Sequence, residues 1–316
     1  MLPFAYFEAS QVKRCLEKNI PQLVRLLEDG FRSLALGSDG GIIQPLRHVV
    51  PAKGHNGALL SMPAYVASIQ SLATKVITHY PNNRSPFASV QGVVILFHAG
   101  TGALKCIMDA EEITAYRTAA ASAVATKYLA TESPKILAVL GAGRQAKSHV
   151  LVMTTMFRFE QVRIWNHRQS SAVSLVQELA ALGISARHEP SVEDAVRDSD
   201  VVVTVTSSPK PVLKAGWLKK GAHVNAVGAP LPDRQELSVE LMRQAVVYVD
   251  STEGARTESG DVIISGADIY AEIGEVVLGT KENRRSDTTV FKSLGMAMED
   301  VLAADLVYRH LADDKS

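Results

Sequence analysis

The chain has 316 residues, of which 33 are Lys or Arg and 33 are Asp or Glu, and its isoelectric point is near 7.1. This length suggests two domains, and the balanced charge argues against a partner such as nucleic acid or an anionic membrane. The two cysteines, Cys15 and Cys106, form no CxxC pair, so neither a disulfide framework nor a zinc site is expected. No segment has the pattern of a signal peptide or a membrane span, and we expect a cytoplasmic protein whose partner is a small molecule.

The first third of the chain combines one helix with antiparallel strands. Apolar residues at helical spacing predict a helix over 20–36. Strands are predicted by short alternating runs at residues 44–50, 57–66 and 72–80, and a hairpin at 90–108 with its turn at 99–102. Asp109 and Glu112 then form a D-x-x-E capping pattern that starts a long alanine-rich helix, which ends before Pro134.

From Lys135 onward, short apolar strands alternate with helical segments. The predicted strands are KILAVLG, QVRIWN, ISARHE, VVVTVTS, AHVNAVG and VVYVD. Such alternation is typical of a parallel sheet with helices on both faces. After Gly260 the pattern is less regular, until an amphipathic helix over 295–314 ends the sequence. We expect this last helix to pack on the first domain.

A glycine-rich turn follows the strand that begins at Lys135. Gly141, Gly143 and Ala146 match the pattern GxGxxG/A between a strand and a helix. The first glycine permits a tight turn, the second lets the backbone approach a pyrophosphate, and the small third residue lets the helix approach the strand. QVRIWN begins 20 residues after Gly141, as the next strand of such a unit should. The sequence therefore predicts a dinucleotide-binding domain.

The end of the second strand indicates which dinucleotide is bound. NAD-binding domains usually carry Asp or Glu there, which accepts hydrogen bonds from the ribose 2′-hydroxyl. This chain has Asn166, His167 and Arg168 instead. A guanidinium beside a neutral amide suits a 2′-phosphate, so NADPH is expected rather than NADH. The alternative is that Arg168 is only a solvated loop charge.

Three cations occupy positions where apolar residues are expected. Arg117 lies in the apolar stripe of the alanine-rich helix, Lys75 shares a strand face with Ala73 and Ile77, and Arg47 shares one with Val49. Buried charges are costly unless an anion meets them. Each could pair with a structural Asp or Glu, or all three could bind one substrate carboxylate.

With these features the chain resembles the ornithine cyclodeaminase and mu-crystallin family. The matching stretches include GGIIQPLRHVVP, ITAYRTAAASAVATKYLA, LGAGRQAKSH, TESGDVIISGADIYAEIGEV and TTVFKSLGMAMEDVLAA, and they span residues 40–304. The resemblance implies an α/β protein with a Rossmann dinucleotide-binding domain and a discontinuous α+β substrate and dimerisation domain. We place the substrate domain at 1–118 and 293–316 and the NADP-binding domain at 119–292. A homodimer without a metal is implied.

The resemblance also assigns roles to individual residues. Arg47, Lys75 and Arg117 would bind the substrate carboxylate, Lys75 and Arg117 would act in catalysis, and Glu258 would lie near the ligand. The implied dinucleotide contacts are Gly141, Ala142, Gly143, Arg144, Gln145, Asn166, His167, Arg168, Thr206, Val227, Gly228 and Ser293.

One departure separates two branches of the family. Ornithine cyclodeaminases carry an aspartate two residues after the glycine of AVG, where this chain has Pro230, which has no titratable group. Our leading interpretation is therefore an NADPH-dependent reductase of cyclic ketimine carboxylates. The alternatives are an amino-acid or opine-type dehydrogenase, an ornithine cyclodeaminase, and a thyroid hormone-binding or crystallin-like protein, since an iodothyronine also carries a carboxylate.

Overall fold

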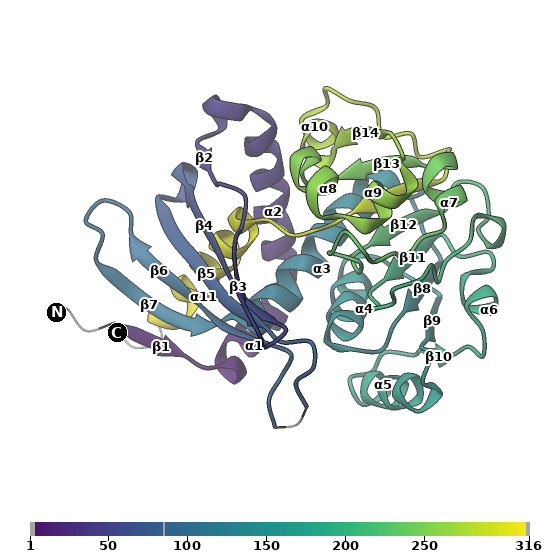
Figure 1. The fold of residues 1–316 in the computed structure, drawn as a ribbon, viewed down its shortest axis with the longest axis horizontal. Helices are drawn as coiled ribbons and strands as arrows, with labels where there is room; N and C mark the ends of the chain where they lie inside the picture. The colour runs from purple at the N-terminus through teal and green to yellow at the C-terminus, as the bar shows by residue number, and fades with distance from the viewer. Residues whose placement is uncertain (1–3, 85, 314–316) are drawn as a thin grey trace. The chain divides into compact units, whose positions relative to one another are not determined.

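The computed structural model describes residues 4–84 and 86–313, which form two compact units (Figure 1). The first unit contains the chain up to Arg117 and again from Met296 onward, and the second contains Thr118–Gly295. Helix α3 (Ala110–Leu129) begins in the first unit and ends in the second. The predicted domain limits, 118/119 and 292/293, would place Ser293 with the C-terminal helix, whereas the structure groups it with the second unit.

The first unit is built on a sheet in the order β1-β7-β6-β5-β4-β2, with β3 also paired to β4. The strands are β1 (Ala5–Phe7), β2 (Ile42–Ile43), β3 (His48–Ala52), β4 (Gly57–Val66), β5 (Ser71–His79), β6 (Val90–His98) and β7 (Leu104–Asp109). All pairs are antiparallel except β1 with β7. The helices are α1 (Ala9–Lys18), α2 (Ile20–Ala35) and α11 (Ala297–Asp313).

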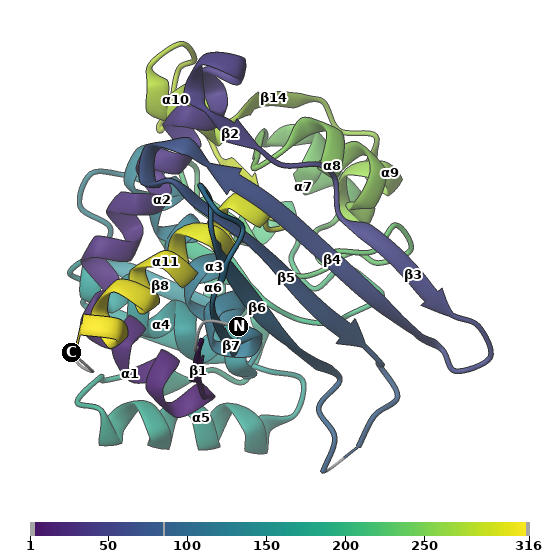
Figure 2. The same cartoon turned by 90° about the vertical axis from the view of Figure 1, so that its left-hand side faces the viewer.

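Helix α11 lies across one face of this sheet, against β4 and β5, and packs beside α2 (Figure 2). Its return to the N-terminal part of the chain is confirmed. The buried residues of β4 alternate as Met62, Ala64 and Val66, so one face of the strand supplies core while the other stays more open.

One prediction for this unit was wrong, and α1, β1 and β2 were not predicted. Residues 44–47 precede β3 and do not belong to it, so Arg47 is not on a strand. Strand β1 was not predicted because three residues are too few to show a periodic pattern, and only its parallel pairing with β7 makes it a strand.

The second unit contains an all-parallel sheet in the order β10-β9-β8-β11-β12-β15-β13-β14. The strands are β8 (Ile136–Leu140), β9 (Gln161–Trp165), β10 (Arg187–His188), β11 (Val201–Thr204), β12 (His223–Ala226), β13 (Val246–Val249), β14 (Ile269–Glu272) and β15 (Thr289–Lys292). The helices are α4 (Arg144–Met156), α5 (Gln169–Ala181), α6 (Val192–Val196), α7 (Val239–Gln244), α8 (Thr252–Glu258), α9 (Gly260–Ser265) and α10 (Ile273–Leu278). The strands β8, β11, β12 and β15 are buried throughout almost all of their length, as expected for a sheet covered on both faces.

The first five strands of this order have the arrangement 3-2-1-4-5 of a Rossmann-type sheet, and the eighth strand of the unit, β15, takes the sixth place. The predicted α/β class is confirmed. The chain order reverses between β8 and β11, which is where such sheets bind nucleotides. Strands β14 and β15 were missed, although β15 lies between β12 and β13 in the middle of the sheet. None of the described helices has both the length and the apolarity to cross a membrane.

Candidate active site

The glycine-rich turn joins β8 to α4 in the predicted way. Gly141 has φ +127°, and a Cβ there would lie 2.9 Å from the carbonyl oxygen of Val205, so the turn itself requires glycine. Gly143 is different, because it has an ordinary φ of −93° at the N-cap of α4 and a Cβ there would meet nothing within 4 Å. The chain's own packing therefore does not demand glycine at position 143, whereas close approach by a phosphate at a helix N-terminus would.

A cleft of about 430 Å³ opens above this turn. It is lined by residues 141–143, 165–168 and 205–209 together with Val212, all in the second unit. Ala142 and Gly143 thus line the cleft, while Arg144 and Gln145 form the first turn of α4.

Asn166, His167 and Arg168 form the loop between β9 and α5 on one wall of the cleft. The Asn166 amide donates a hydrogen bond of 3.0 Å to the carbonyl oxygen of Arg168, which shapes the loop. His167 and Arg168 are exposed, and the Arg168 side chain makes no ion pair with any residue that the structure describes. The guanidinium is therefore available to an anion in this cleft.

The remaining predicted dinucleotide contacts follow three adjacent strands. Thr206 comes after β11, Val227 and Gly228 follow β12, and Ser293 follows β15. Since β11 pairs with β12 and β12 with β15, parallel pairing brings these residues together at the carboxyl edge of the sheet.

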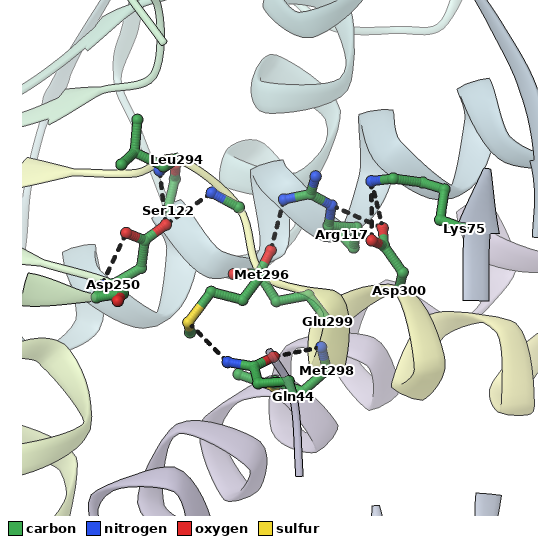
Figure 3. A network of polar contacts seen from close by, with 12 residues as sticks. Gln44, Lys75, Arg117, Ser122, Asp250, Leu294, Met296, Met298, Glu299 and Asp300 are labelled. Atoms are coloured by element: carbon green, nitrogen blue, oxygen red, sulfur yellow. Dashed lines mark hydrogen bonds and ion pairs between the residues drawn. The ribbon is translucent and has the colours of Figure 1, made fainter. Parts of the chain in front are cut away.

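In the first unit, Lys75 and Arg117 converge on acidic side chains of α11 (Figure 3). Lys75 Nζ lies 2.9 Å from Asp300 Oδ1 and 2.8 Å from Oδ2. Arg117 donates from Nε to Asp300 at 3.1 Å and from Nη1 to Glu299 at 2.7 Å. All four side chains are buried, with Lys75 only 1% exposed and Arg117 4%.

Burial lowers the pKa of Lys75 to about 8. The Asp300 carboxylate opposes this shift, and the positive charges of Arg117 and Arg47 add to it. Arg47 is therefore close enough to Lys75 to act on it electrostatically, although it lies on the segment before β3. All three cations lie in the first unit, and two of them, Lys75 and Arg117, pair with Asp or Glu side chains, which is one of the two alternatives that the sequence left open.

Asp300 and Glu299 were not identified from the sequence. Both lie in the first turn of α11, where the helix dipole favours negative charge. Gln44 accepts a hydrogen bond of 2.9 Å from the Met298 N–H and so secures the same turn (Figure 3). The sequence does contain a sign of their role, because they are a pair of acidic residues in the otherwise apolar start of the helix, GMAMEDVLAA. Two acidic residues in an apolar stretch are suitable partners for the cations at apolar positions of the earlier segments.

Glu258, the fourth predicted substrate residue, ends α8 in the second unit and is half-buried. The predicted substrate residues are thus divided between the units, with three cations in the first and one carboxylate in the second.

The buried histidine of α4 has a structural role. His149 Nδ1 lies 2.7 Å from the Gln145 carbonyl oxygen, and its Nε2 lies 3.0 Å from Ser122 Oγ. Burial lowers the pKa of His149 to about 4, so the ring is neutral and ties the first turn of α4 to α3. Among the described residues, no group of His, Cys, Asp and Glu side chains is arranged to hold a metal ion.

The similarity of this chain to known proteins extends over nearly its whole length. The ketimine reductase mu-crystallin of Macropus fuliginosus is 47% identical over 308 residues, which cover 96% of each chain. The solved structure of Thermococcus litoralis Δ1-pyrroline-2-carboxylate reductase in complex with NADH and L-proline is 34% identical, with a TM-score of 0.92 and 98% of each chain covered. An archaeal alanine dehydrogenase dimer with bound NAD is 31% identical, with a TM-score of 0.91 over 99% of this chain and 97% of that one. With its sequence matched over residues 8–315, the chain belongs to the ornithine cyclodeaminase/mu-crystallin family.

Proposed function

We propose that this protein uses NADPH to reduce the C=N bond of cyclic ketimine carboxylates, such as Δ1-piperideine-2-carboxylate and Δ1-pyrroline-2-carboxylate, to cyclic amino acids. The observation that carries this proposal is the buried Lys75–Asp300–Arg117 cluster in a chain that also has a dinucleotide-binding cradle. The similarity to a ketimine reductase and to a pyrroline-2-carboxylate reductase supports it.

The cations of the first unit supply the substrate-binding chemistry. Arg117 and Arg47 attract the carboxylate, and the planar guanidinium of Arg117 suits bidentate contact with it. Asp300 and Glu299 hold Arg117 in place through two hydrogen bonds, which reduces the freedom that the side chain loses when substrate binds. The negative charge of a bound carboxylate also offsets the mutual repulsion of Lys75 and the two arginines.

Lys75 is the proposed proton donor. Reduction adds a hydride to the imine carbon and a proton to the nitrogen, and the bound dinucleotide supplies the hydride. A lysine with a pKa of about 8 is mostly protonated at neutral pH yet releases its proton far more readily than an ordinary lysine. Asp300 keeps the ammonium group of Lys75 oriented for the transfer.

NADPH is proposed as the cofactor because Arg168 offers an exposed guanidinium in the cleft and no carboxylate occupies the loop that it shares with Asn166. Replacing Arg168 by Ala should raise the KM for NADPH by about tenfold or more, through loss of a charged hydrogen bond, and leave the KM for NADH nearly unchanged. Equal KM values for the two cofactors in the wild-type enzyme would reject the preference.

The experiment that tests the proposed activity follows NADPH oxidation with a panel of substrates. Cyclic ketimine carboxylates should be reduced fastest, and the same imines without a carboxylate should react poorly. Pyruvate with ammonia or amines tests the amino-acid or opine-type dehydrogenase alternative, which the likeness to alanine dehydrogenase favours. Release of ammonia from ornithine with NAD would support a cyclodeaminase, for which Pro230 provides no acid or base.

Binding of an iodothyronine is a second proposed activity, since its amino-acid carboxylate could occupy the same cations. Titration of triiodothyronine with and without NADPH tests it. Tight binding without measurable imine reduction would favour a binding protein over an enzyme.

We also propose a homodimer formed through the open part of the first sheet. The apolar side chains Ile43, Val49 and Val50 are 68%, 54% and 60% exposed on β2 and β3, which both pair with β4. Light scattering should give twice the chain mass, and Val50→Lys should reduce it to one. Cys15 and Cys106 are both buried and neither forms a disulfide, which accords with the reducing cytoplasm as the proposed location.

A further inference from the structure

Next to the predicted dinucleotide contacts that follow β11, β12 and β15 lie three charged residues with no solvent exposure. Glu236, Asp261 and Lys292 are each 0% exposed. They come from the segment before α7, from the start of α9 and from the end of β15. None of them belongs to the glycine-rich turn or to the cation cluster of the first unit.

Glu236 holds the loop that follows β11. Its Oε1 accepts a hydrogen bond of 2.5 Å from the Thr206 N–H, and its Oε2 accepts one of 2.7 Å from the Thr204 hydroxyl. Burial raises the pKa of Glu236, and the Lys292 ammonium opposes that shift. The carboxylate thus fixes the backbone at Thr206, one of the predicted dinucleotide contacts.

Lys292 holds the loop that follows β12. Its Nζ donates to the carbonyl oxygen of Gly228 and lies 3.0 Å from Asp261 Oδ2. Asp261 Oδ1 in turn accepts from the N–H groups of Glu236 and Leu237 at 2.8 and 3.0 Å. One connected network therefore joins the loops after β11 and β12 to the residue that directly precedes Ser293.

Gly228 shows how closely these parts are packed. A Cβ at this position would lie 2.3 Å from Glu236 Cδ and 2.3 Å from the Thr206 carbonyl oxygen. Any side chain at position 228 would displace either the carboxylate or the Thr206 loop, so the glycine is required by the network.

Ser293 points to a ligand at the same place. Its hydroxyl is buried and has no hydrogen-bond partner within residues 4–84 and 86–313. Buried hydroxyl groups are nearly always hydrogen-bonded, so a bound molecule would supply the missing partner. The carboxamide of a nicotinamide has both a donor and an acceptor for this purpose.

We infer that Glu236, Asp261 and Lys292 are positioning residues for the nicotinamide half of the dinucleotide, acting through Thr206, Gly228 and Ser293. The inference rests on the proposed dinucleotide-dependent function. Buried charges of this kind add little to the stability of a fold compared with apolar residues of similar size. A network of three is better explained by a role in holding the backbone of the cofactor-binding loops in one defined position.

A binding experiment separates this role from a purely structural one. Glu236→Gln keeps the shape of the side chain and removes its charge, and Thr204→Val removes only the hydroxyl donor. Isothermal titration measures the affinity of each variant for NADPH and for 2′,5′-ADP, which contains the adenosine half without nicotinamide. If the wild type prefers NADH, then NADH and 5′-ADP replace this pair.

We expect Glu236→Gln to weaken NADPH binding by about tenfold or more, as loss of a charge-assisted hydrogen bond to a binding loop should, and to leave 2′,5′-ADP binding within about twofold. Thr204→Val should also weaken NADPH binding, by a smaller factor than Glu236→Gln, and leave 2′,5′-ADP binding within about twofold. Asp200→Asn is the matched control, because Asp200 is a well-buried aspartate that accepts from the Lys135 and Ile136 N–H groups at the opposite edge of the sheet. It should leave the ratio of the two affinities unchanged.

Equal losses for NADPH and 2′,5′-ADP, or unchanged NADPH affinity in both variants, would overturn the inference. A wild-type protein that binds neither NADPH nor NADH would instead refute the proposed function.

Discussion

Replacing Asp300 by Asn tests the proposed role of Lys75 directly. The substitution keeps the shape of the side chain and removes the negative charge that lies 2.8 Å from Lys75 Nζ. Asp300 is the main group that raises the pKa of Lys75 against burial and against the positive charges of Arg117 and Arg47. Without it, the pKa of Lys75 should fall further below its present value of about 8.

The expected size of this effect follows from the contact distance. A nearby opposite charge shifts a pKa by about 1–3 units, so a decrease of about two units is a reasonable central value. At pH 7 the protonated fraction of Lys75 would then fall from about nine tenths to about one tenth. If the ammonium donates the proton, kcat/KM at pH 7 should decrease by about tenfold.

The assay is the pH dependence of kcat/KM for one cyclic ketimine at saturating NADPH. In the wild type, kcat/KM should decline as the pH rises through about 8, because the proton donor is lost. In Asp300→Asn the decline should begin at a pH about two units lower. Protonation of the substrate itself also changes with pH, but it affects the wild type and Asp300→Asn equally and does not alter the comparison.

Asp305→Asn is the control for damage to α11. Asp305 is also buried on this helix, but it contacts Ser71 and Arg309 and does not pair with Lys75. Its profile should overlay that of the wild type. If the Asp300→Asn profile also overlays the wild type while the variant remains folded, Lys75 is not the proton donor.

Three further predictions concern the cradle, the buried histidine and the carboxylate site. Gly143→Ala should change the free energy of unfolding by less than about 1 kcal/mol yet weaken dinucleotide binding by about tenfold or more, whereas Gly141→Ala should destabilise the fold itself. Calorimetry measures the stability of each variant and titration measures its binding. Unimpaired binding by Gly143→Ala would contradict the proposed close approach of a phosphate to this glycine. Because burial lowers the pKa of His149 from 6.5 to about 4, only the unfolded state gains its proton as the pH falls through that interval, so the stability associated with this residue is present above pH 6.5 and is lost toward pH 4. In urea titrations between pH 6.5 and 4, the free energy of unfolding should therefore fall with decreasing pH less steeply in His149→Gln than in the wild type, by about 1.4 kcal/mol per pH unit. Equal slopes for the two proteins would mean that the buried ring also takes up a proton in this interval. Arg117→Ala should lower kcat/KM for the ketimine by about 2 kcal/mol or more, and normal turnover in a folded variant would exclude Arg117 from substrate binding.

Much of the fold was predictable because local patterns and tertiary packing agree. Strands β4 to β7, helices α2 and α3, and the alternating elements from β8 to β13 all have clear periodicity. Strand β15 was not predictable in this way, since a four-residue strand in a polar context has no distinctive local pattern. Its position between β12 and β13 depends on pairing with residues far away in the sequence.

The candidate site was predictable to a different degree in each unit. The glycine turn and the loop at Asn166–Arg168 are local features, and the structure places both in one cleft. The cations Lys75 and Arg117 were recognised as anomalies, but their partners were not, because Glu299 and Asp300 lie more than 180 residues farther along the chain. The buried network of Glu236, Asp261 and Lys292 gave no signal, since each residue alone resembles a surface charge.

By itself, the sequence determined the α/β class, the dinucleotide cradle and the presence of misplaced positive charges, because these depend on residues within a few positions of one another. Only the tertiary structure decided which carboxylates meet those charges, where β15 enters the sheet and what lies behind the cofactor loops. The physical reason is that the cost of burying a charge depends on all the groups around it in space, and chain folding brings those groups together from distant segments.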